Sequence, residues 1–353
     1  MNLNQLSAPG KSSRPAPCSH GAPLGPRQQT SRLQTSRRNL LVVAGAACLP
    51  ALVRSQGSFP TRPITLIVPW SAGGATDVTL RLLAELAGKT LGQRIIIDNR
   101  PGAGGTMAMP VMQSAAPDGY TLSQLPYPAL RTPHVQKVSW DPIRDTTPII
   151  QISGVTFGVV VPVNSAFKSF DDLLKFAAAK PGELAISTNG LGTTPHVVLD
   201  ELFGQRNLRY IHVPYKGTAE QMLAVASGHL MAGVNSNGFA PYVESGKLRL
   251  LATFGDQRSQ RWSQVPTLKE LGYGIVANSP YGLVGPRAME PQIVRILHDA
   301  FKAALFDPQH VAELAKYEQE PNYLDAKDYA SALRDAYAAE KRNVERLGQA
   351  KAP

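Results

Sequence analysis

The sequence predicts an α/β protein made of two lobes with a ligand cleft between them. Short β-branched runs typical of buried strands alternate along the chain with segments whose apolar residues recur at helical spacing. Two extended stretches, Phe157 to Pro162 and Tyr281 to Pro286, are placed so that the chain can cross twice between lobes. We therefore expect residues 56–157 plus 281–353 to form one lobe and residues 158–280 to form the other.

The first predicted element is a strand that leads through a glycine turn into a helix. Ile64 to Val68 is short and apolar, and Val78 to Leu91 carries leucines at helical spacing. Between them, the pair Gly73-Gly74 allows positive φ angles and lets a ligand approach the peptide N–H groups. With the positive end of the following helix, these groups can form an anion site. A single turn of this kind more often has only a structural role.

Two further turns of the same chemistry strengthen the functional interpretation. The strand-like run Ile95 to Ile97 leads into Asn99 to Thr106, which is rich in glycine. Leu184 to Ser187 leads into Thr188 to His196, which contains Gly190 and Gly192. Three strand ends with small-residue loops predict one cleft built largely from backbone groups. We expect the anion site to depend on Gly73, Gly74 and Gly192.

The remaining elements follow in alternating order, which favours largely parallel sheets. The predicted strands are 121–125, 155–163, 248–253 and 276–284, and the predicted helices are 170–179, 219–226 and the segments after Pro291 that Pro308 and Pro321 divide.

The first 55 residues differ from the rest of the chain. They hold seven basic and no acidic residues, so most of the formal net charge of +10 lies there, and nucleic acid is not an expected partner. Arg37-Arg38 precedes the apolar run Leu40 to Val53, a pattern typical of a cleaved export signal with processing near Gln56. The pair fits a twin-arginine signal and an ordinary secretory signal equally well. Either route would place the mature chain in the periplasm.

The composition of the mature chain excludes several kinds of site. Both cysteines, Cys18 and Cys48, fall inside the leader, so thiol catalysis and cysteine-ligated metals are not expected after cleavage. The sequence shows no metal-binding histidine motif, no phosphate loop and no nucleophile elbow. We therefore expect no cofactor, no metal and no catalysis. An exported hydrolase that pairs Ser71 or Ser187 with His196 remains the alternative, and a ligand sensor for a signalling kinase is another.

A set of motifs in a fixed order identifies a resemblance that covers nearly all of the mature chain. The motifs are Pro69 to Asp77, Asn99 to Gly105, Pro117 to Leu122, Gly190 to His196, His212 to Gly217, Val265 to Leu268 and Gly285-Pro286. In these the chain resembles the solute receptors of tripartite tricarboxylate transporters, also called Bug proteins. The resemblance implies a fold like that of type II periplasmic binding proteins. It also implies closure on a small carboxylate and delivery to membrane transporter subunits.

In that family, backbone N–H groups and ordered water in one loop from each lobe hold the carboxylate. On this sequence the resemblance places those loops at Trp70 to Asp77 and Thr188 to His196. The candidate ligand-binding residues are Trp70, Ser71, Ala72, Gly73, Gly74, Asp77, Gly104, Thr106, Thr188, Asn189, Gly192, Thr193, His196 and Asn235.

Simpler roles are expected for two of these residues. Asp77 is most simply a residue that accepts N–H groups at a helix start, and His196 a bridge between its loop and its helix. Trp70, just after a strand, is expected to form a wall of the pocket. We expect a monomer. The ligand could be a dicarboxylate, a tricarboxylate, an aromatic acid or an amino acid, because backbone N–H groups recognise only the anion.

Overall fold

The computed structural model describes residues 59–348. The predicted export signal, its processing site and both cysteines lie outside the described residues. The chain divides into two units, Met1–Arg54 and Ser55–Pro353, and the described residues all belong to the second.

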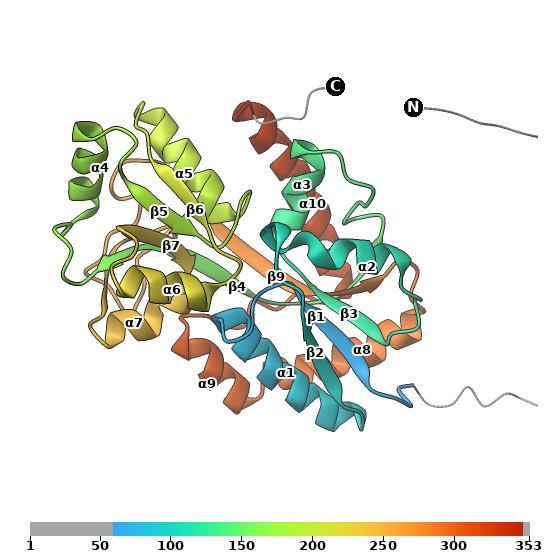
Figure 1. Ribbon diagram of the computed structural model, residues 1–353. Helices are drawn as coiled ribbons and strands as arrows, with labels where there is room; N and C mark the ends of the chain where they lie inside the picture. The colour runs from blue at the N-terminus through green and yellow to red at the C-terminus, as the bar shows by residue number, and fades with distance from the viewer. Residues whose placement is uncertain (1–58, 349–353) are drawn as a thin grey trace, which may run out of the picture. The chain divides into compact units, whose positions relative to one another are not determined.

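Alternating strands and helices form an α/β structure (Figure 1). The strands are Ile64–Val68 (β1), Ile95–Asn99 (β2), Thr121–Leu125 (β3), Thr146–Pro162 (β4), Ala185–Thr188 (β5), Ile211–Pro214 (β6), Ala232–Ser236 (β7), Leu248–Thr253 (β8) and Asn278–Pro286 (β9). The α-helices are Ala75–Leu91 (α1), Met109–Ser114 (α2), Pro128–Val135 (α3), Phe170–Ala179 (α4), Thr194–Gln205 (α5), Thr218–Ala226 (α6), Ala240–Glu244 (α7), Pro291–Leu305 (α8), Pro308–Lys316 (α9) and Ala326–Arg346 (α10). Two short 3-10 helices are Ala103–Ala108 (η1) and Asn237–Phe239 (η2).

The strand order is β2-β1-β3-β9-β4-β7-β5-β6, and β8 pairs with β4. β1 runs parallel to β2 and β3, and β5 runs parallel to β6 and β7. The prediction of largely parallel sheets is wrong in the centre, where β4 and β9 are antiparallel to each other and to their other neighbours. The reason is that β4 carries the chain out of one sheet region and the adjacent β9 brings it back.

Strand β4 belongs to both parts of the sheet and thereby defines two lobes (Figure 1). Its first part, Thr146 to Thr156, pairs with β9, and its second part, from Phe157, pairs with β7 and β8. Lobe 1 contains β1 to β3 and helices α1 to α3 and α8 to α10. Lobe 2 contains β5 to β8 and helices α4 to α7. The strands that connect these two parts of the sheet are thus β4 and β9, and β4 begins earlier than predicted.

Each lobe has its own hydrophobic core. In lobe 1, Leu66, Leu83 and Phe301 belong to a cluster in which β1 packs against α1 and α8. In lobe 2, Ile186 and Leu199 belong to a separate cluster around β5 and α5. Full burial of such a side chain stabilises a fold by about 1.5–3 kcal/mol. Each lobe is thus stabilised by packing within itself. The stability of the lobes therefore does not require an apolar interface between them.

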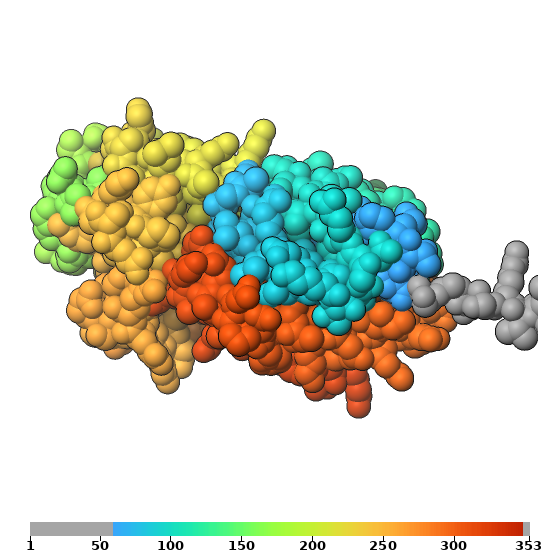
Figure 2. Space-filling view, turned by 90° about the horizontal axis from the view of Figure 1, so that it is seen from below, coloured from blue at the N-terminus to red at the C-terminus, as the bar shows by residue number. Residues whose placement is uncertain are grey.

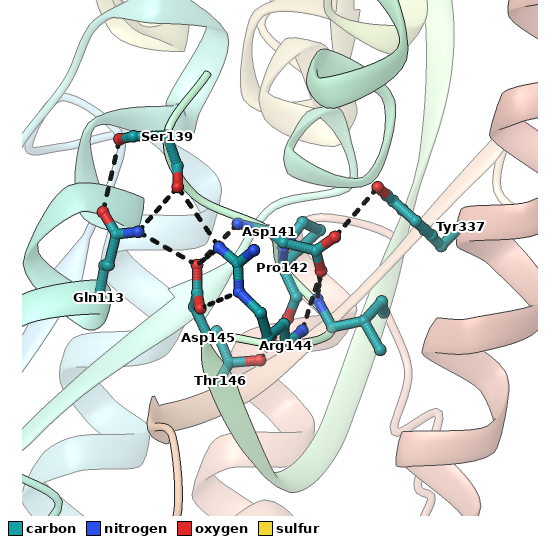
Figure 3. A network of polar contacts seen from close by, with 9 residues as sticks. Gln113, Ser139, Asp141, Pro142, Arg144, Asp145, Thr146 and Tyr337 are labelled. Atoms are coloured by element: carbon teal, nitrogen blue, oxygen red, sulfur yellow. Dashed lines mark hydrogen bonds and ion pairs between the residues drawn. The ribbon is translucent and has the colours of Figure 1, made fainter. Parts of the chain in front are cut away.

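A polar network fixes the start of β4 in lobe 1 (Figure 3). Arg144 forms a bidentate ion pair with Asp145, with both N–O distances at 2.7 Å. Asp145 also accepts the N–H of Asp141 at 2.8 Å, and Tyr337 of α10 donates to Asp141 at 3.3 Å. The Arg144 hydrogen bond holds the pKa of Asp145 below its ordinary value. The connection from α3 to β4 is therefore held by an ion pair, and the hydrogen bond from Tyr337 to Asp141 ties it to α10.

Between residues 59 and 348, no helix combines the length and the apolar character needed to cross a bilayer.

Candidate functional site

A cavity of about 50 Å³ lies between the lobes. Lobe 1 contributes Trp70, Ser71, Gly74, Thr76, Asp77, Gln124, Pro126, Tyr127 and Pro128 to its lining, and lobe 2 contributes Asn189, Thr193, Thr194, Pro195, Thr218 and Ser236. The crossing strands add Val155, Phe157, Ser279 and Tyr281. The cavity lies where β1 leads into α1 and where β5 leads into α5, so the two predicted loops do meet at one place.

The predicted site residues divide into two groups. Those that line the cavity are Trp70, Ser71, Gly74, Asp77, Asn189 and Thr193. Those outside the lining are Ala72, Gly73, Gly104, Thr106, Thr188, Gly192, His196 and Asn235. Several of the second group hold a loop in shape. Thr106 Oγ1 donates to the Ala103 carbonyl at 2.9 Å, for example, and the Asn235 side chain donates to Gln221.

In the first loop, Asp77 holds the turn together. Gly73, at φ +83°, donates its N–H to Asp77 Oδ2 at 2.8 Å. Arg81 Nε donates to the same oxygen at 2.9 Å, and Asn99 Nδ2 donates to Oδ1 at 2.7 Å. Burial alone would raise the pKa of Asp77, but the bonds from Arg81, Asn99 and Gly73 outweigh it and lower the pKa. The contacts agree with the helix-start interpretation of this residue.

In the second loop, His196 occupies the corresponding place. Gly192, at φ +70°, donates its N–H to His196 Nδ1 at 3.1 Å. The imidazole stacks on His212 with ring centroids 3.9 Å apart, and its Nε2 lies 3.5 Å from Asp200. Burial lowers the pKa of His196 below its ordinary value, so the ring is neutral and can accept the glycine N–H. His196 bridges its loop and its helix, as expected.

These bonds change which N–H groups can hold an anion. The N–H groups of Gly73 and Gly192 are already used within their own loops, which corrects their expected role as anion donors. The first N–H groups of an α-helix have no partner inside the helix. Thr76 of α1 and Thr194 of α5 are first-turn residues and line the cavity. The cavity therefore faces the positive ends of α1 from lobe 1 and α5 from lobe 2, and Thr218, the first residue of α6 in lobe 2, also lines it.

Aromatic side chains form a wall whose polar atoms are engaged elsewhere. Trp70 Nε1 donates to Gln124 Oε1 at 3.0 Å, and Tyr281 OH donates to Gln319 Oε1 at 2.9 Å. The position of Trp70 agrees with the predicted pocket wall. Sequence reasoning missed Gln124, Tyr127 and Tyr281, because residues in or just after a strand read as core. Gln124, a polar residue near the end of strand β3, is the feature of the sequence that could have indicated this part of the site.

Small residues let the two lobes touch beside the cavity. A Cβ atom on Gly217 would lie 2.4 Å from Ser71 Cβ, and one on Gly104 would lie 2.7 Å from the Leu191 carbonyl oxygen. Gly104 therefore serves close approach between lobes rather than the cavity lining. Arg131 of α3, ion-paired with Glu340, also donates to the Gly192 carbonyl at 3.1 Å. These contacts join the two lobes beside the cavity.

The face seen in Figure 2 shows a second region of contact, where the red segment that contains α9 lies against lobe 2. Asn237 Nδ2 of lobe 2 donates to the Glu318 carbonyl at 2.8 Å. Arg261 donates to the Lys316 carbonyl at 3.1 Å. Both contacts use backbone carbonyl groups at the end of α9, so they depend on the position of that helix.

The geometry offers no support for the Ser/His alternative. Ser187 is fully buried and accepts a hydrogen bond from Gln221 Nε2 at 3.1 Å. In the part of the chain that the structure describes, no hydrogen bond joins Ser71 or Ser187 to His196, whose Nδ1 already accepts the Gly192 N–H. Nor do residues 59–348 contain a group of three His, Cys, Asp or Glu side chains placed to hold a metal ion.

Known proteins resemble this chain in sequence and in fold. The sequence model of one protein family, described as the tripartite tricarboxylate transporter family receptor, matches residues 79–349 of this chain. A relative from Cupriavidus necator, called UPF0065 protein in gbd 5'region, is 46% identical over 308 residues, which are 87% of this chain and 94% of that protein.

Two solved structures share the fold. Periplasmic binding protein BugD has a TM-score of 0.79 at 23% identity, over 83% of this chain and 100% of its own. The R. palustris protein Rpa4515, solved with adipate, has a TM-score of 0.77 at 28% identity, over 82% of this chain and 98% of its own. The fold is therefore that of a periplasmic binding protein.

Proposed function

We propose that this chain, which belongs to the tripartite tricarboxylate transporter receptor family, captures a small carboxylate between its lobes. It then presents this ligand to the membrane subunits of a transporter of that type. Lobes formed by residues 56–157 plus 281–353 and by residues 158–280 would move about β4 and β9. The protein would act in the periplasm, after removal of its export signal, as a monomer and without catalysis.

The observation that carries the proposal is the meeting of helix N-termini from both lobes at one cavity. The end of each helix is equivalent to about half a positive charge. The first turns of α1 and α5 belong to different lobes, so one anion contacts both only when the cleft is closed. A carboxylate would bind the closed state better than an open one, and this difference in affinity drives closure.

The adipate in the R. palustris protein supports a carboxylate as the ligand class. The proposal can be tested by a thermal-shift screen of the mature chain, Gln56 to Pro353, against carboxylates of varied length and charge. A ligand at about 100 times its Kd stabilises a fold by about 2.7 kcal/mol, which corresponds to a shift of a few degrees. A ligand recovered unchanged would support a receptor, whereas a ligand consumed during incubation would favour a hydrolase.

A pair of variants tests the helix-terminus site directly. Thr76→Asp adds a negative charge in the first turn of α1, where it favours the helix but repels a bound anion. We expect this variant to be as stable as the parent or more stable, and to lose carboxylate binding. Thr76→Asn, of similar size and neutral, serves as the matched control and should retain most of the affinity. Unchanged affinity in Thr76→Asp would contradict the site.

A further inference from the structure

Two arginines join the lobes through the same kind of contact. Arg131 of α3, in lobe 1, donates from Nη1 to the carbonyl of Gly192 in lobe 2 at 3.1 Å. Arg261 of lobe 2 donates from Nη1 to the carbonyl of Lys316, the last residue of α9 in lobe 1, at the same distance of 3.1 Å. Neither arginine lies in the cavity lining. The two contacts nevertheless differ in their burial and in the segment that each one holds.

The first arginine belongs to a buried ion pair and the second to an exposed one. The side chains of Arg131 and Glu340 are 7% and 3% exposed, whereas those of Arg261 and Glu244 are 35% and 50% exposed. A buried charge stays with its partner, because an unpaired charge in the interior is strongly destabilising. The Arg131 guanidinium uses Nε for Glu340 and Nη1 for the lobe 2 carbonyl, so one rigid plane serves both. Its donor is therefore already oriented within lobe 1.

The acceptor of Arg131 stands just before the part of lobe 2 that borders the cavity. Gly192 donates its N–H to His196 of its own lobe and accepts from Arg131 of the other lobe, so both of its backbone polar groups are engaged. Thr194, two residues later, is the first residue of α5 and lines the cavity. In lobe 1, Pro128 also lines the cavity and begins α3, three residues before Arg131. The contact thus ties the start of α5 to the start of α3 at the cavity edge.

We propose that Arg131 is a positioning residue for ligand capture, which holds the start of α5 against the cavity through the Gly192 carbonyl. Because this bond joins the two lobes, it exists only while they are in contact. It therefore prolongs the time for which a ligand is held and does not speed its entry. The inference rests on the proposed function and adds to it the residue that sets this time. Arg261, whose contact holds the end of α9 away from the lining, has no such role.

Rates of ligand binding test this role. In the double variant Arg131→Met with Glu340→Met, both members of the buried pair become apolar, so no unpaired charge is left in the interior. Stopped-flow measurements use adipate or, if adipate does not bind, the first acid that binds in the thermal-shift screen. We expect the dissociation rate to rise at least ten-fold and the association rate to stay nearly the same, because changes within one interface act mostly on dissociation.

The matched control is the double variant Arg261→Met with Glu244→Met. It removes the same chemistry from the other contact between the lobes, and we expect it to leave both rates nearly unchanged. If circular dichroism shows that the Arg131 and Glu340 double variant does not fold, Arg131→Lys provides the same test. Its single ammonium nitrogen keeps the charge beside Glu340 but cannot occupy the positions of both Nε and Nη1.

Each outcome decides the inference. An unchanged dissociation rate in a folded variant of Arg131 would overturn the positioning role and leave the receptor function standing. An equal rise in the Arg261 control would also overturn it, since any contact between the lobes would then have the same effect. Failure of every acid to bind the parent protein would overturn the receptor function and this role together.

Discussion

The two loops that border the cavity share one design and differ in chemistry. In each, a glycine with positive φ donates its N–H to a side chain four residues later, in the first turn of the following helix. The acceptor is the carboxylate of Asp77 in lobe 1 and the neutral imidazole of His196 in lobe 2. Asp77 also receives bonds from Arg81 and Asn99, whereas His196 stacks on His212.

The difference shows that the same loop conformation can be stabilised by two hydrogen-bond acceptors that differ in their sensitivity to pH. Hydrogen bonds from charged and neutral donors keep the pKa of Asp77 low, so this acceptor stays ionised well into the acid range. His196 accepts the Gly192 N–H only while its Nδ1 is unprotonated. The loop of lobe 1 should therefore be the more stable, and the loop of lobe 2 should be the sensitive one.

The largest expected effect comes from removal of the lobe 1 acceptor. Asp77→Ala leaves the Gly73 N–H and the Arg81 and Asn99 side chains without their shared partner. We expect the free energy of unfolding to fall by about 3 kcal/mol, measured by urea denaturation, and carboxylate binding to be lost. His196→Ala should cost less, about 2 kcal/mol, because it removes one neutral hydrogen bond and the stacking contact with His212. Equal losses in the two variants would contradict this difference between the loops. Glu85→Ala, in an exposed pair with Lys89, is the control.

A second prediction concerns the contact of the loops across the cleft. Gly217→Ala introduces no backbone strain, since its φ is −163°, but its Cβ would lie 2.4 Å from Ser71 Cβ. We expect affinity for the ligand to fall at least ten-fold, about 1.4 kcal/mol, with little change in thermal stability of the free protein. The double variant with Ser71→Gly should recover part of the loss. A tenfold loss that persists in the double variant would show that the contact is not the cause.

Gly104 provides the matching test at the other contact. Gly104→Ala and Gly92→Ala both place alanine at positive φ, +64° and +65°, so both carry a similar strain of about 1–2 kcal/mol. A Cβ on Gly92 meets nothing within 4 Å, whereas one on Gly104 would meet the Leu191 carbonyl oxygen at 2.7 Å. Calorimetry should therefore show weaker binding for Gly104→Ala alone. Similar affinities in the two variants would remove Gly104 from the closure contact.

The lobe 2 loop should contribute to the pH dependence of stability, together with His310 of α9, whose pKa burial also lowers. Burial lowers the pKa of His212 to about 4, and burial also lowers that of His196, where Arg131 acts in the same direction and Asp200 opposes it. Unfolded histidines have a pKa of about 6.5, so between about pH 6.5 and 4 the unfolded chain binds more protons. Stability is thus fully present above pH 6.5 and is lost as the pH falls.

Urea denaturation at pH 7.5 and pH 4.5 measures this loss. We expect the part due to these histidines to be on the order of 1 kcal/mol, because both rings are partly screened by solvent. His212→Gln should flatten the pH profile, and Asp77→Asn should not. A profile that is the same with and without His212 would place the pH dependence elsewhere.

The smallest expected effect concerns a pair at the rim of the lobe interface. Arg346 of α10 lies 2.7 Å from Glu201 of α5, and its side chain is 56% exposed. Exposed ion pairs contribute about 0–1 kcal/mol. Arg346→Ala should therefore change ligand affinity less than about five-fold at ordinary ionic strength. A larger change in calorimetry would show that this pair, and not the loops, controls closure.

Sequence patterns predicted the local elements well, because local elements depend on nearby residues. Strand 121–125, helix 170–179 and strand 248–253 have the predicted bounds. Pro308 and Pro321 divide the C-terminal helices as expected, since proline lacks the N–H that a helix interior needs. The antiparallel pairing of β4 with β9 was not predicted, because alternation of strands and helices says nothing about a strand that serves two lobes.

The amino-acid sequence alone was enough to assign the family and to predict two lobes and their glycine loops, because glycines after apolar strands leave a local and ordered signature. Which groups of those loops line the cavity became clear only from the folded chain. There the N–H groups of Gly73 and Gly192 are bound to Asp77 and His196, and Gln124, Val155 and Tyr281 lie in the lining. These assignments depend on residues far apart in the chain that meet when the lobes pack together, and no local pattern records such contacts.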